Sequence, residues 1–296
     1  MAQAAIPRWA GVLVLAAIAT VFGSNHVAAR VAFEHGANVQ TAVAVRSTGT
    51  ALFVLALLAA QRVPVRLPRA SLGRAAAIGV LLALQSYCLY SAVALIPVAL
   101  ALLAFQTFPM VLALITWAAE GTRPARRTLV AMPVALAGLA LALDVAGAGG
   151  AVADRWSEIG AGVLWASGAS LSFGGVLYLT NRWLPAVDGR LRTLVVMTVV
   201  AAVMIAASAA TDSFRLPADA RGWTALALLT FFYGSAFIAL FIVLPRVDAV
   251  NTSFALNFEP VAVLAIAWIA LGQAIAPLQI AGMFVVLAAI VFGARR

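Results

Sequence analysis

The chain has 296 residues, of which 65% are hydrophobic and only 10% are charged, and its formal net charge is +9. Because an ordinary soluble domain is about 25% charged, this composition excludes a protein that folds in water. The positive charges lie between long apolar runs and form no basic stripe with interleaved aromatic residues, so we expect no nucleic-acid partner.

The apolar residues divide into stretches of the length that crosses a bilayer, about 20 residues each. The first stretch is longer than the core of a signal peptide and contains Asn25, His26 and Arg30, so we interpret it as a retained helix. Only Ile96 and Pro97 separate the third stretch from the fourth. The predicted helices occupy residues 11–33, 38–60, 72–95, 97–118, 128–146, 159–180, 192–211, 223–244, 247–271 and 277–294. We therefore predict an all-α membrane protein with ten transmembrane helices in one domain, 1–296.

Arginine counting predicts the orientation, because cytoplasmic loops retain positive charge. With the N-terminus inside, fourteen arginines lie in inner segments and three in outer segments. Arg30 and Arg46 lie within predicted helices. So large a bias favours an even number of helices with both termini on the cytoplasmic side.

The two halves of the chain repeat at an offset of 151 residues. Matched proline, tryptophan, glycine and methionine residues are less expected by chance than matched alanine or leucine. The pairs are Pro109 with Pro260, Trp117 with Trp268, Gly121 with Gly272, and Met132 with Met283. We predict repeat one at 10–146, a linker at 147–156 and repeat two at 157–294. Five helices in each half invert the second repeat relative to the first, with a substrate site near the midplane between them.

These motifs resemble the drug/metabolite transporter superfamily, specifically its ten-helix exporters with two EamA repeats. The first helix reads Phe-Gly-Ser-Asn at 22–25 and is followed by Arg30, while the ninth contains Glu259-Pro260. The family often has Gly-Glu after the fourth and ninth helices, whereas this chain has Gly272-Gln273, so no carboxylate role transfers to Gln273. The resemblance implies a bacterial inner-membrane exporter. Length and aromatic-rich central helices are similar to those of aromatic amino-acid exporters.

Glu259 is the carboxylate for which the predicted membrane position is most costly. It lies about twelve residues into the predicted ninth helix, roughly 18 Å deep at about 1.5 Å per residue and near the middle of a core about 30 Å thick. It can accept a proton or bind a substrate ammonium, with Pro260 loosening the helix beside it. A structural carboxyl paired at a proline kink is the alternative. Pro109 is the corresponding predicted kink in the first half.

The other candidates are polar or aromatic side chains within the predicted helices. Asn25 and His26 either contact the substrate or form an internal hydrogen bond. Arg30 and Arg46 are candidate contacts for a carboxylate, or they snorkel or pair structurally. The aromatic and amide candidates are Tyr87, Tyr90, Gln106, Trp165, Tyr233 and Asn257. Tyr87 and Tyr90 with Trp165 would form cavity walls that suit aromatic or amphiphilic substrates, and Gln106 and Asn257, which the 151-residue shift superposes, would supply polar contacts. Ordinary helix packing or an interfacial aromatic belt is the alternative.

The sequence lacks the signatures of several other function classes. The chain has no lysine and so no P-loop, two histidines and no His-Glu-x-x-His motif, and no charged ring or carbonyl filter of a channel. The one cysteine excludes an internal disulfide and a cysteine-based metal motif. We expect no cofactor, no metal and no enzymatic activity.

The remaining class is a secondary carrier that works by alternating access, and ten helices can enclose its site as a monomer. We expect facilitative export of small organic metabolites, amino acids with aromatic preference. Proton-coupled efflux of cationic or amphiphilic drugs is the alternative substrate class, and a membrane scaffold or sensor is the alternative outside transport.

Overall fold

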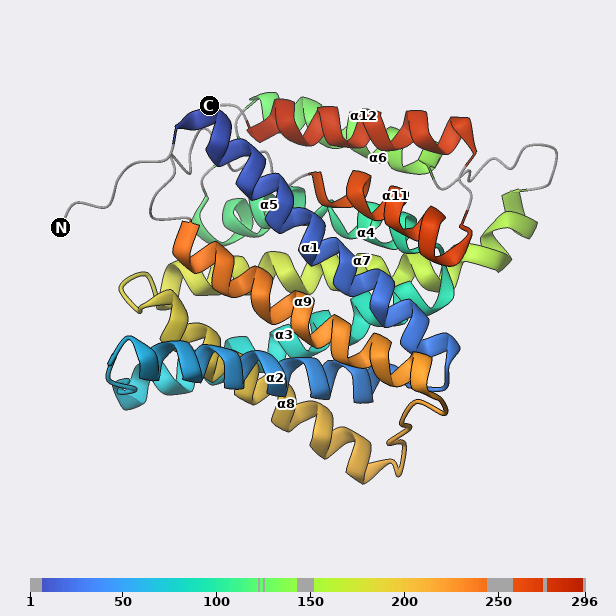
Figure 1. Ribbon diagram of the computed structural model, residues 1–296. Helices are drawn as coiled ribbons and strands as arrows, with labels where there is room; N and C mark the ends of the chain where they lie inside the picture. The colour runs from blue at the N-terminus through green and yellow to red at the C-terminus, as the bar shows by residue number, and fades with distance from the viewer. Residues whose placement is uncertain are drawn as a thin grey trace.

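The computed structural model describes residues 7–121, 123–124, 126–142, 152–243, 258–273 and 276–294. Regular secondary structure within these ranges is helical throughout (Figure 1). The helices are α1 (Arg8–Glu34), α2 (Val39–Ala60), α3 (Arg69–Leu95), α4 (Val98–Phe105), α5 (Phe108–Glu120), α6 (Arg126–Ala142), α7 (Val152–Trp183), α8 (Gly189–Ala210), α9 (Ala220–Val243), α11 (Glu259–Leu271) and α12 (Pro277–Ala294).

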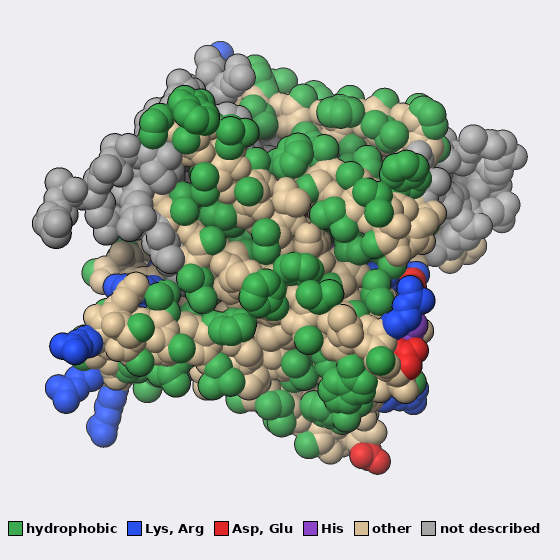
Figure 2. Space-filling model, viewed as in Figure 1, with side chains coloured by type: hydrophobic (Ala, Val, Ile, Leu, Met, Phe, Trp, Pro, Cys, Tyr) green, Lys and Arg blue, Asp and Glu red, His purple; other side chains and the backbone are tan. Residues whose placement is uncertain are grey.

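Seven helical segments of the described residues are long and apolar enough to cross a membrane, with α4 and α5 together forming one of them. Three shorter apolar helices lie at Leu129–Ala142, Glu259–Leu271 and Pro277–Ala289. The all-helical membrane fold is thus confirmed, while the number of ten crossings stays a prediction. Hydrophobic side chains cover the face seen in Figure 2, and the charged side chains gather toward its two ends, as a bilayer-spanning body requires.

The predicted fourth membrane segment, 97–118, is confirmed as one apolar span, Val98–Glu120, but its helix breaks between Phe105 and Phe108. Pro109 lies in the first turn of α5 and has no N–H to donate, and its ring clashes with the carbonyl one turn earlier. The Thr107 hydroxyl donates to the Ala104 carbonyl at 2.8 Å and satisfies one group that the break frees. Pro260 has the same place in the first turn of α11. Both prolines therefore begin helices rather than kink them internally.

The helix bounds repeat at the offset read from the sequence. The helices α5 and α11 each have 13 residues, and each ends at a glycine in the left-handed conformation, Gly121 with φ 70° and Gly272 with φ 64°. A side chain is strained at such a φ, which explains why glycine stands at both positions. α7 begins at Val152, so the last residues of the predicted linker are helical, and the rest of the linker lies outside the described residues. The repeat boundaries remain predictions.

The packing of the helices follows the same internal symmetry. α1 packs against α9 as α3 packs against α7, and α2 packs against α8 and α6 against α12. α1 and α7 run in opposite directions in Figure 1, as do α2 and α8. This arrangement is the one expected when the second repeat is inverted, and it brings α1, α2, α3, α9 and α11 around one interior region.

Candidate functional site

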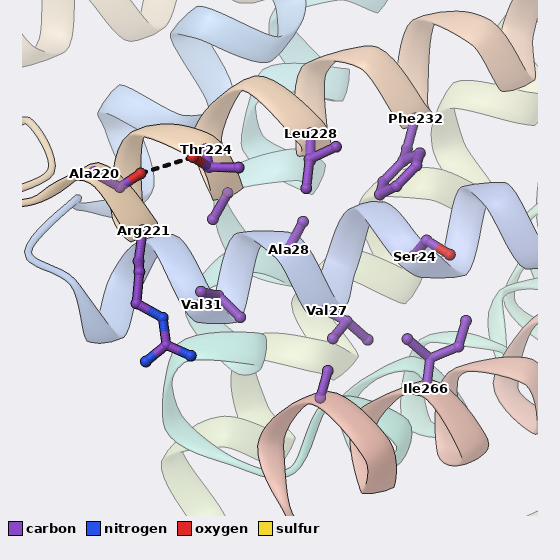
Figure 3. Close-up of a pocket in the computed structure, with 12 residues that line it drawn as sticks. Ser24, Val27, Ala28, Val31, Ala220, Arg221, Thr224, Leu228, Phe232 and Ile266 are labelled. Atoms are coloured by element: carbon purple, nitrogen blue, oxygen red, sulfur yellow. Dashed lines mark hydrogen bonds between the residues drawn. The ribbon is translucent and has the colours of Figure 1, made fainter.

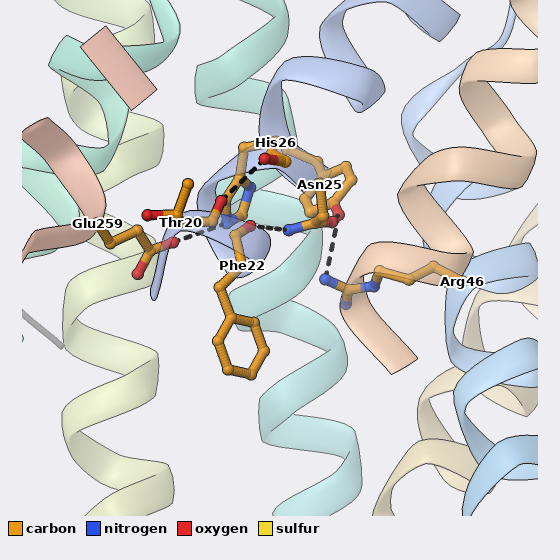
Figure 4. A network of polar contacts seen from close by, with 8 residues as sticks. Thr20, Phe22, Asn25, His26, Arg46 and Glu259 are labelled. Atoms are coloured by element: carbon orange, nitrogen blue, oxygen red, sulfur yellow. Dashed lines mark hydrogen bonds and ion pairs between the residues drawn. The ribbon is translucent and has the colours of Figure 1, made fainter. Parts of the chain in front are cut away.

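Six predicted site residues from five helices lie in one polar cluster in the interior. We call it the central cluster. Its members touch or face one another across helices that are far apart in the chain. They are Asn25 and His26 on α1, Arg46 on α2, Tyr90 on α3, Tyr233 on α9 and Glu259 on α11. Figure 4 shows four of them, Asn25, His26, Arg46 and Glu259.

Arg46 is the cation of the central cluster and is only 3% exposed. Its guanidinium donates to the Tyr90 hydroxyl at 3.2 Å and to the Ser86 hydroxyl at 2.9 Å. The guanidinium carbon lies 4.0 Å from the centroid of the Tyr233 ring and 4.8 Å from that of Tyr90. Two aromatic faces and two hydroxyls therefore hold this buried charge by cation–π contact and hydrogen bonds.

No carboxylate of the described residues pairs with Arg46. Its buried Nε also has no hydrogen-bond partner there. A buried charge normally has a counter-ion, and an unsatisfied buried donor is costly. The Arg46 guanidinium can therefore bind an additional anionic group.

Asn25 connects α1 to α3 within the central cluster. Its side-chain oxygen accepts a hydrogen bond from the Tyr90 hydroxyl, and its amide nitrogen donates to the Phe22 carbonyl at 2.8 Å. Tyr90 in turn accepts from Arg46, so a chain of hydrogen bonds runs from α1 through α3 to α2. Such a chain fixes the orientation of the Arg46 guanidinium.

Glu259 is the carboxylate of the central cluster, and its side chain keeps 22% of its surface exposed. The Nε2 of His26 lies 3.6 Å from its Oε1, close enough for an electrostatic contact but too far for a hydrogen bond. No donor within the described part of the chain hydrogen-bonds this carboxylate, and the Nδ1 of His26 has no partner there either. The carboxylate also lies at the first residue of α11, where the helix dipole favours negative charge.

An aromatic wall borders the central cluster on the side of Tyr233. Phe22, Tyr233 and Phe237 pack edge to face with ring centroids 4.9 to 5.7 Å apart. Because Tyr233 also covers Arg46, this wall places ring edges and faces beside a cation.

The remaining predicted residues lie elsewhere. Tyr87 packs edge to face on Trp165, which is 37% exposed, whereas Tyr90 contacts Arg46. The cavity wall of Tyr87, Tyr90 and Trp165 stays a prediction. Arg30 pairs with Glu34 at 2.8 Å and also donates to the carbonyls of α3. Gln106 is buried at the end of α4, and Asn257 lies outside the described residues.

Ser86 is a member of the central cluster that the sequence interpretation missed. It contacts Arg46 and accepts a 2.9 Å hydrogen bond from it. Its position four residues before Tyr90 is the available signal, since residues four apart share one face of a helix. A lone serine in an apolar helix is otherwise uninformative, because it can satisfy its hydroxyl on its own backbone.

The internal pseudo-symmetry of the fold does not repeat the central cluster. The offset of 151 places Val176, Leu177 and Met197 at the positions that match Asn25, His26 and Arg46. Phe108 matches Glu259 and packs with Phe173 at 4.9 Å. The backbone plan is therefore duplicated, while the polar chemistry is present in one copy.

A second group of contacts ties α1 to the start of α9 at one end of the bundle. The Nδ1 of His35 lies 2.7 Å from the Asp219 carboxylate, and the Ala218 N–H donates to the His35 carbonyl at 2.8 Å. Asp219 also accepts from the Gly222 N–H at 2.8 Å. These donors, the Gly222 N–H first and the His35 ring second, lower the pKa of the Asp219 carboxyl below its ordinary value. We call this group the end latch.

The comparisons with known proteins agree with this fold. A family model described as the EamA-like transporter family matches residues 9–143 and 160–294. No curated protein matches the chain. Among solved structures 15 chains match. One, a crystal structure of a protein 20% identical to this chain, has a TM-score of 0.64 and is matched over 97% of this chain and 96% of its own. At that identity the likeness shows a shared fold alone.

Proposed function

Because the chain belongs to the EamA-like transporter family, a family of multi-pass membrane transporters for small molecules, we propose that it exports amino acids with a preference for aromatic side chains. It works as a secondary carrier without ATP, by alternating access around the central cluster. It lies in the bacterial inner membrane as a monomer with ten crossings and with both termini in the cytoplasm. The observation that carries the proposal is that the buried Arg46 has no carboxylate partner among the described residues. The carboxylate of Glu259 lies in the same cluster and accepts no hydrogen bond from a described donor.

A free amino acid supplies the two groups that this cluster lacks. Its carboxylate binds the Arg46 guanidinium through charge-assisted hydrogen bonds, including one from the unsatisfied Nε. Its ammonium binds Glu259, which no described donor occupies. The zwitterion is then neutralised at both ends, which lowers the cost of taking it into the membrane.

The aromatic preference rests on the wall of Phe22, Tyr233 and Phe237. An incoming ring can join this edge-to-face arrangement, and such aromatic pairs contribute about 0.5–1.5 kcal/mol beyond burial. Aliphatic amino acids gain only the burial of their side chain.

Facilitative transport is the simpler mechanism, since the first helix carries no carboxylate in its interior and Glu259 is the one described carboxylate in the central cluster. Proton-coupled efflux of a cationic drug is the second candidate, favoured by Glu259 next to aromatic rings. Arg46 argues against it, because a cation beside a buried guanidinium is repelled.

The test is counterflow of labelled phenylalanine, tryptophan and threonine into liposomes that contain the purified protein, with methyl viologen as competitor, at equal and unequal pH. We expect saturable flux of the aromatic amino acids that does not depend on the pH gradient. Flux of viologen alone, or flux only along a pH gradient, would assign the protein to drug antiport. No saturable flux of any of these compounds would favour the scaffold or sensor role.

A further inference from the structure

A groove of about 480 Å³ lies between α1, α9 and α11 (Figure 3). Its walls are apolar, with Val27 and Val31 on α1, Leu228 and Phe232 on α9, and Ile266 on α11. Two hydroxyl groups reach the groove, and both are already used. Ser24 donates to the Thr20 carbonyl and Thr224 to the Ala220 carbonyl, each at 2.8 Å. The surface offered to a ligand is therefore hydrocarbon.

This groove is separate from the central cluster. On α1 it is lined by Ser24, Val27 and Val31, which follow the three- and four-residue spacing of one helix face, whereas Asn25 and His26 point from other faces of the same helix. Toward the central cluster, α1 and α11 are in close contact at Gly23. A Cβ added to Gly23 would lie 2.5 Å from the Val263 Cγ2. The close crossing at Gly23 thus lies between Glu259 and the groove.

One charged side chain lines the groove, and it lies at the end near the loop before α9. Arg221 is in the first turn of α9 and is exposed, and its guanidinium has no acceptor among the described residues. The neighbouring carboxylates are already engaged, Asp219 by His35 and Glu34 by Arg30. A single uncompensated cation at the mouth of an apolar groove complements an anion with a hydrocarbon tail.

The length of the groove matches one leaflet. From Arg221 to Phe232 the lining of α9 extends over eleven residue steps, roughly 17 Å at about 1.5 Å per residue. Half of a bilayer core is about 15 Å. A chain that enters beside Arg221 therefore runs to about the middle of the membrane.

We infer that this groove binds one acyl chain of an anionic phospholipid, with the lipid phosphate on Arg221. The hydrocarbon is buried against Val27, Leu228 and Ile266, and the phosphate accepts bidentate hydrogen bonds from the guanidinium. The lipid thereby bridges α1, α9 and α11, three helices that also supply residues of the central cluster. This site is independent of the transported substrate.

The experiment is native mass spectrometry of the purified protein released from micelles with phosphatidylglycerol or phosphatidylcholine of identical acyl chains. We expect one retained phosphatidylglycerol, with phosphatidylcholine binding about tenfold more weakly, because the choline cation neutralises the phosphate charge that Arg221 binds and is itself repelled by the guanidinium. Arg221→Gln removes the preference for phosphatidylglycerol. Arg215→Gln, which changes an exposed arginine at the same end but outside the groove, retains it.

A second pair of variants tests the acyl-chain site. Ala270→Phe fills the groove from an exposed position on α11, and Ala265→Phe adds the same ring at an exposed position outside it. We expect the first variant to lose lipid retention and the second to keep it. Equal retention by all four variants and the wild type would overturn the inference. So would displacement of the lipid by phenylalanine, which would assign the groove to substrate, or a dimer that Ala270→Phe dissociates, which would assign it to a second copy.

Discussion

The guanidinium carbon of Arg46 on α2 lies 4.0 Å from the centre of the Tyr233 ring on α9. This contact joins the two repeats, because α2 belongs to the first half and α9 to the second. It also joins a cation to an aromatic wall, so a substrate with a carboxylate and a ring can engage both at once. A relative movement of α2 and α9 would change both parts of the proposed binding site together.

Arg46→Gln should lower the affinity for phenylalanine by at least about tenfold, since charge-assisted hydrogen bonds contribute about 1.5–3 kcal/mol. The measurement is the half-saturation concentration in counterflow. Arg66→Gln, at an exposed position, is the matched control and should leave it unchanged. Inhibition by 2-phenylethylamine, which lacks the carboxylate, should not weaken in Arg46→Gln. Equal weakening for the amine would mean that Arg46 does not bind the carboxylate.

Glu259→Gln should reduce phenylalanine flux by less than about tenfold, because the amide oxygen can still accept a hydrogen bond from the substrate ammonium. Wild-type flux and the flux of this variant should be equally insensitive to a pH gradient. Glu120→Gln, at an exposed carboxylate that ends α5, serves as the control. Loss of a pH-driven component in Glu259→Gln alone, with substrate binding retained, would establish proton coupling.

Tyr90→Phe should destabilise the protein by about 1–3 kcal/mol, because it removes the hydroxyl that donates to Asn25 and accepts from Arg46 and leaves both partners unsatisfied in the interior. Tyr87→Phe is the matched control, since Tyr87 contributes a ring contact to Trp165 and no hydroxyl bond within the described residues. Thermal unfolding in detergent, followed by tryptophan fluorescence, compares the two. Equal shifts in the two variants would contradict the hydrogen-bonded role of Tyr90.

Gly49→Ala should destabilise the crossing of α2 and α9, because the added Cβ would lie 2.2 Å from the Thr230 Cγ2. Overpacking of this kind costs about 1–3 kcal/mol. Adding Thr230→Ser removes the obstructing methyl and should restore much of the loss. Gly73→Ala meets nothing within 4 Å and should not destabilise the protein, since alanine is the better helix former. A destabilised double variant would show that the steric contact is not the cause.

Asp219→Asn should open the end latch by weakening the contact with His35. Because the Gly222 N–H and His35 lower the pKa of Asp219, its stabilising contribution is present above its ordinary pKa of 3.8 and is lost as the pH falls through the lowered value. The difference in melting temperature between wild type and Asp219→Asn should be constant from neutral pH to about pH 5 and should shrink below about pH 4. Asp212→Asn, exposed at the end of α8, should show no such difference. A difference that grows in acid would contradict this assignment.

The sequence by itself determined the membrane character, the helical class and the repeat at an offset of 151. Hydrophobicity and length are local properties of a segment, and they decide directly whether that segment can cross a bilayer as a helix. It also singled out Arg46 and Glu259, since charges within apolar helices are rare and costly. These properties need no knowledge of which helices are neighbours.

The tertiary structure decided which candidates meet. Tyr87 and Tyr90 share a helix three residues apart, yet the packing of α3 between α1, α2 and α7 directs Tyr90 to Arg46 and Tyr87 to Trp165. Likewise the 151-residue repeat predicts two equivalent halves, but apolar residues stand at the positions that match Asn25, Arg46 and Glu259 in the other half. Contacts between distant helices depend on crossing geometry, which a one-dimensional pattern does not contain.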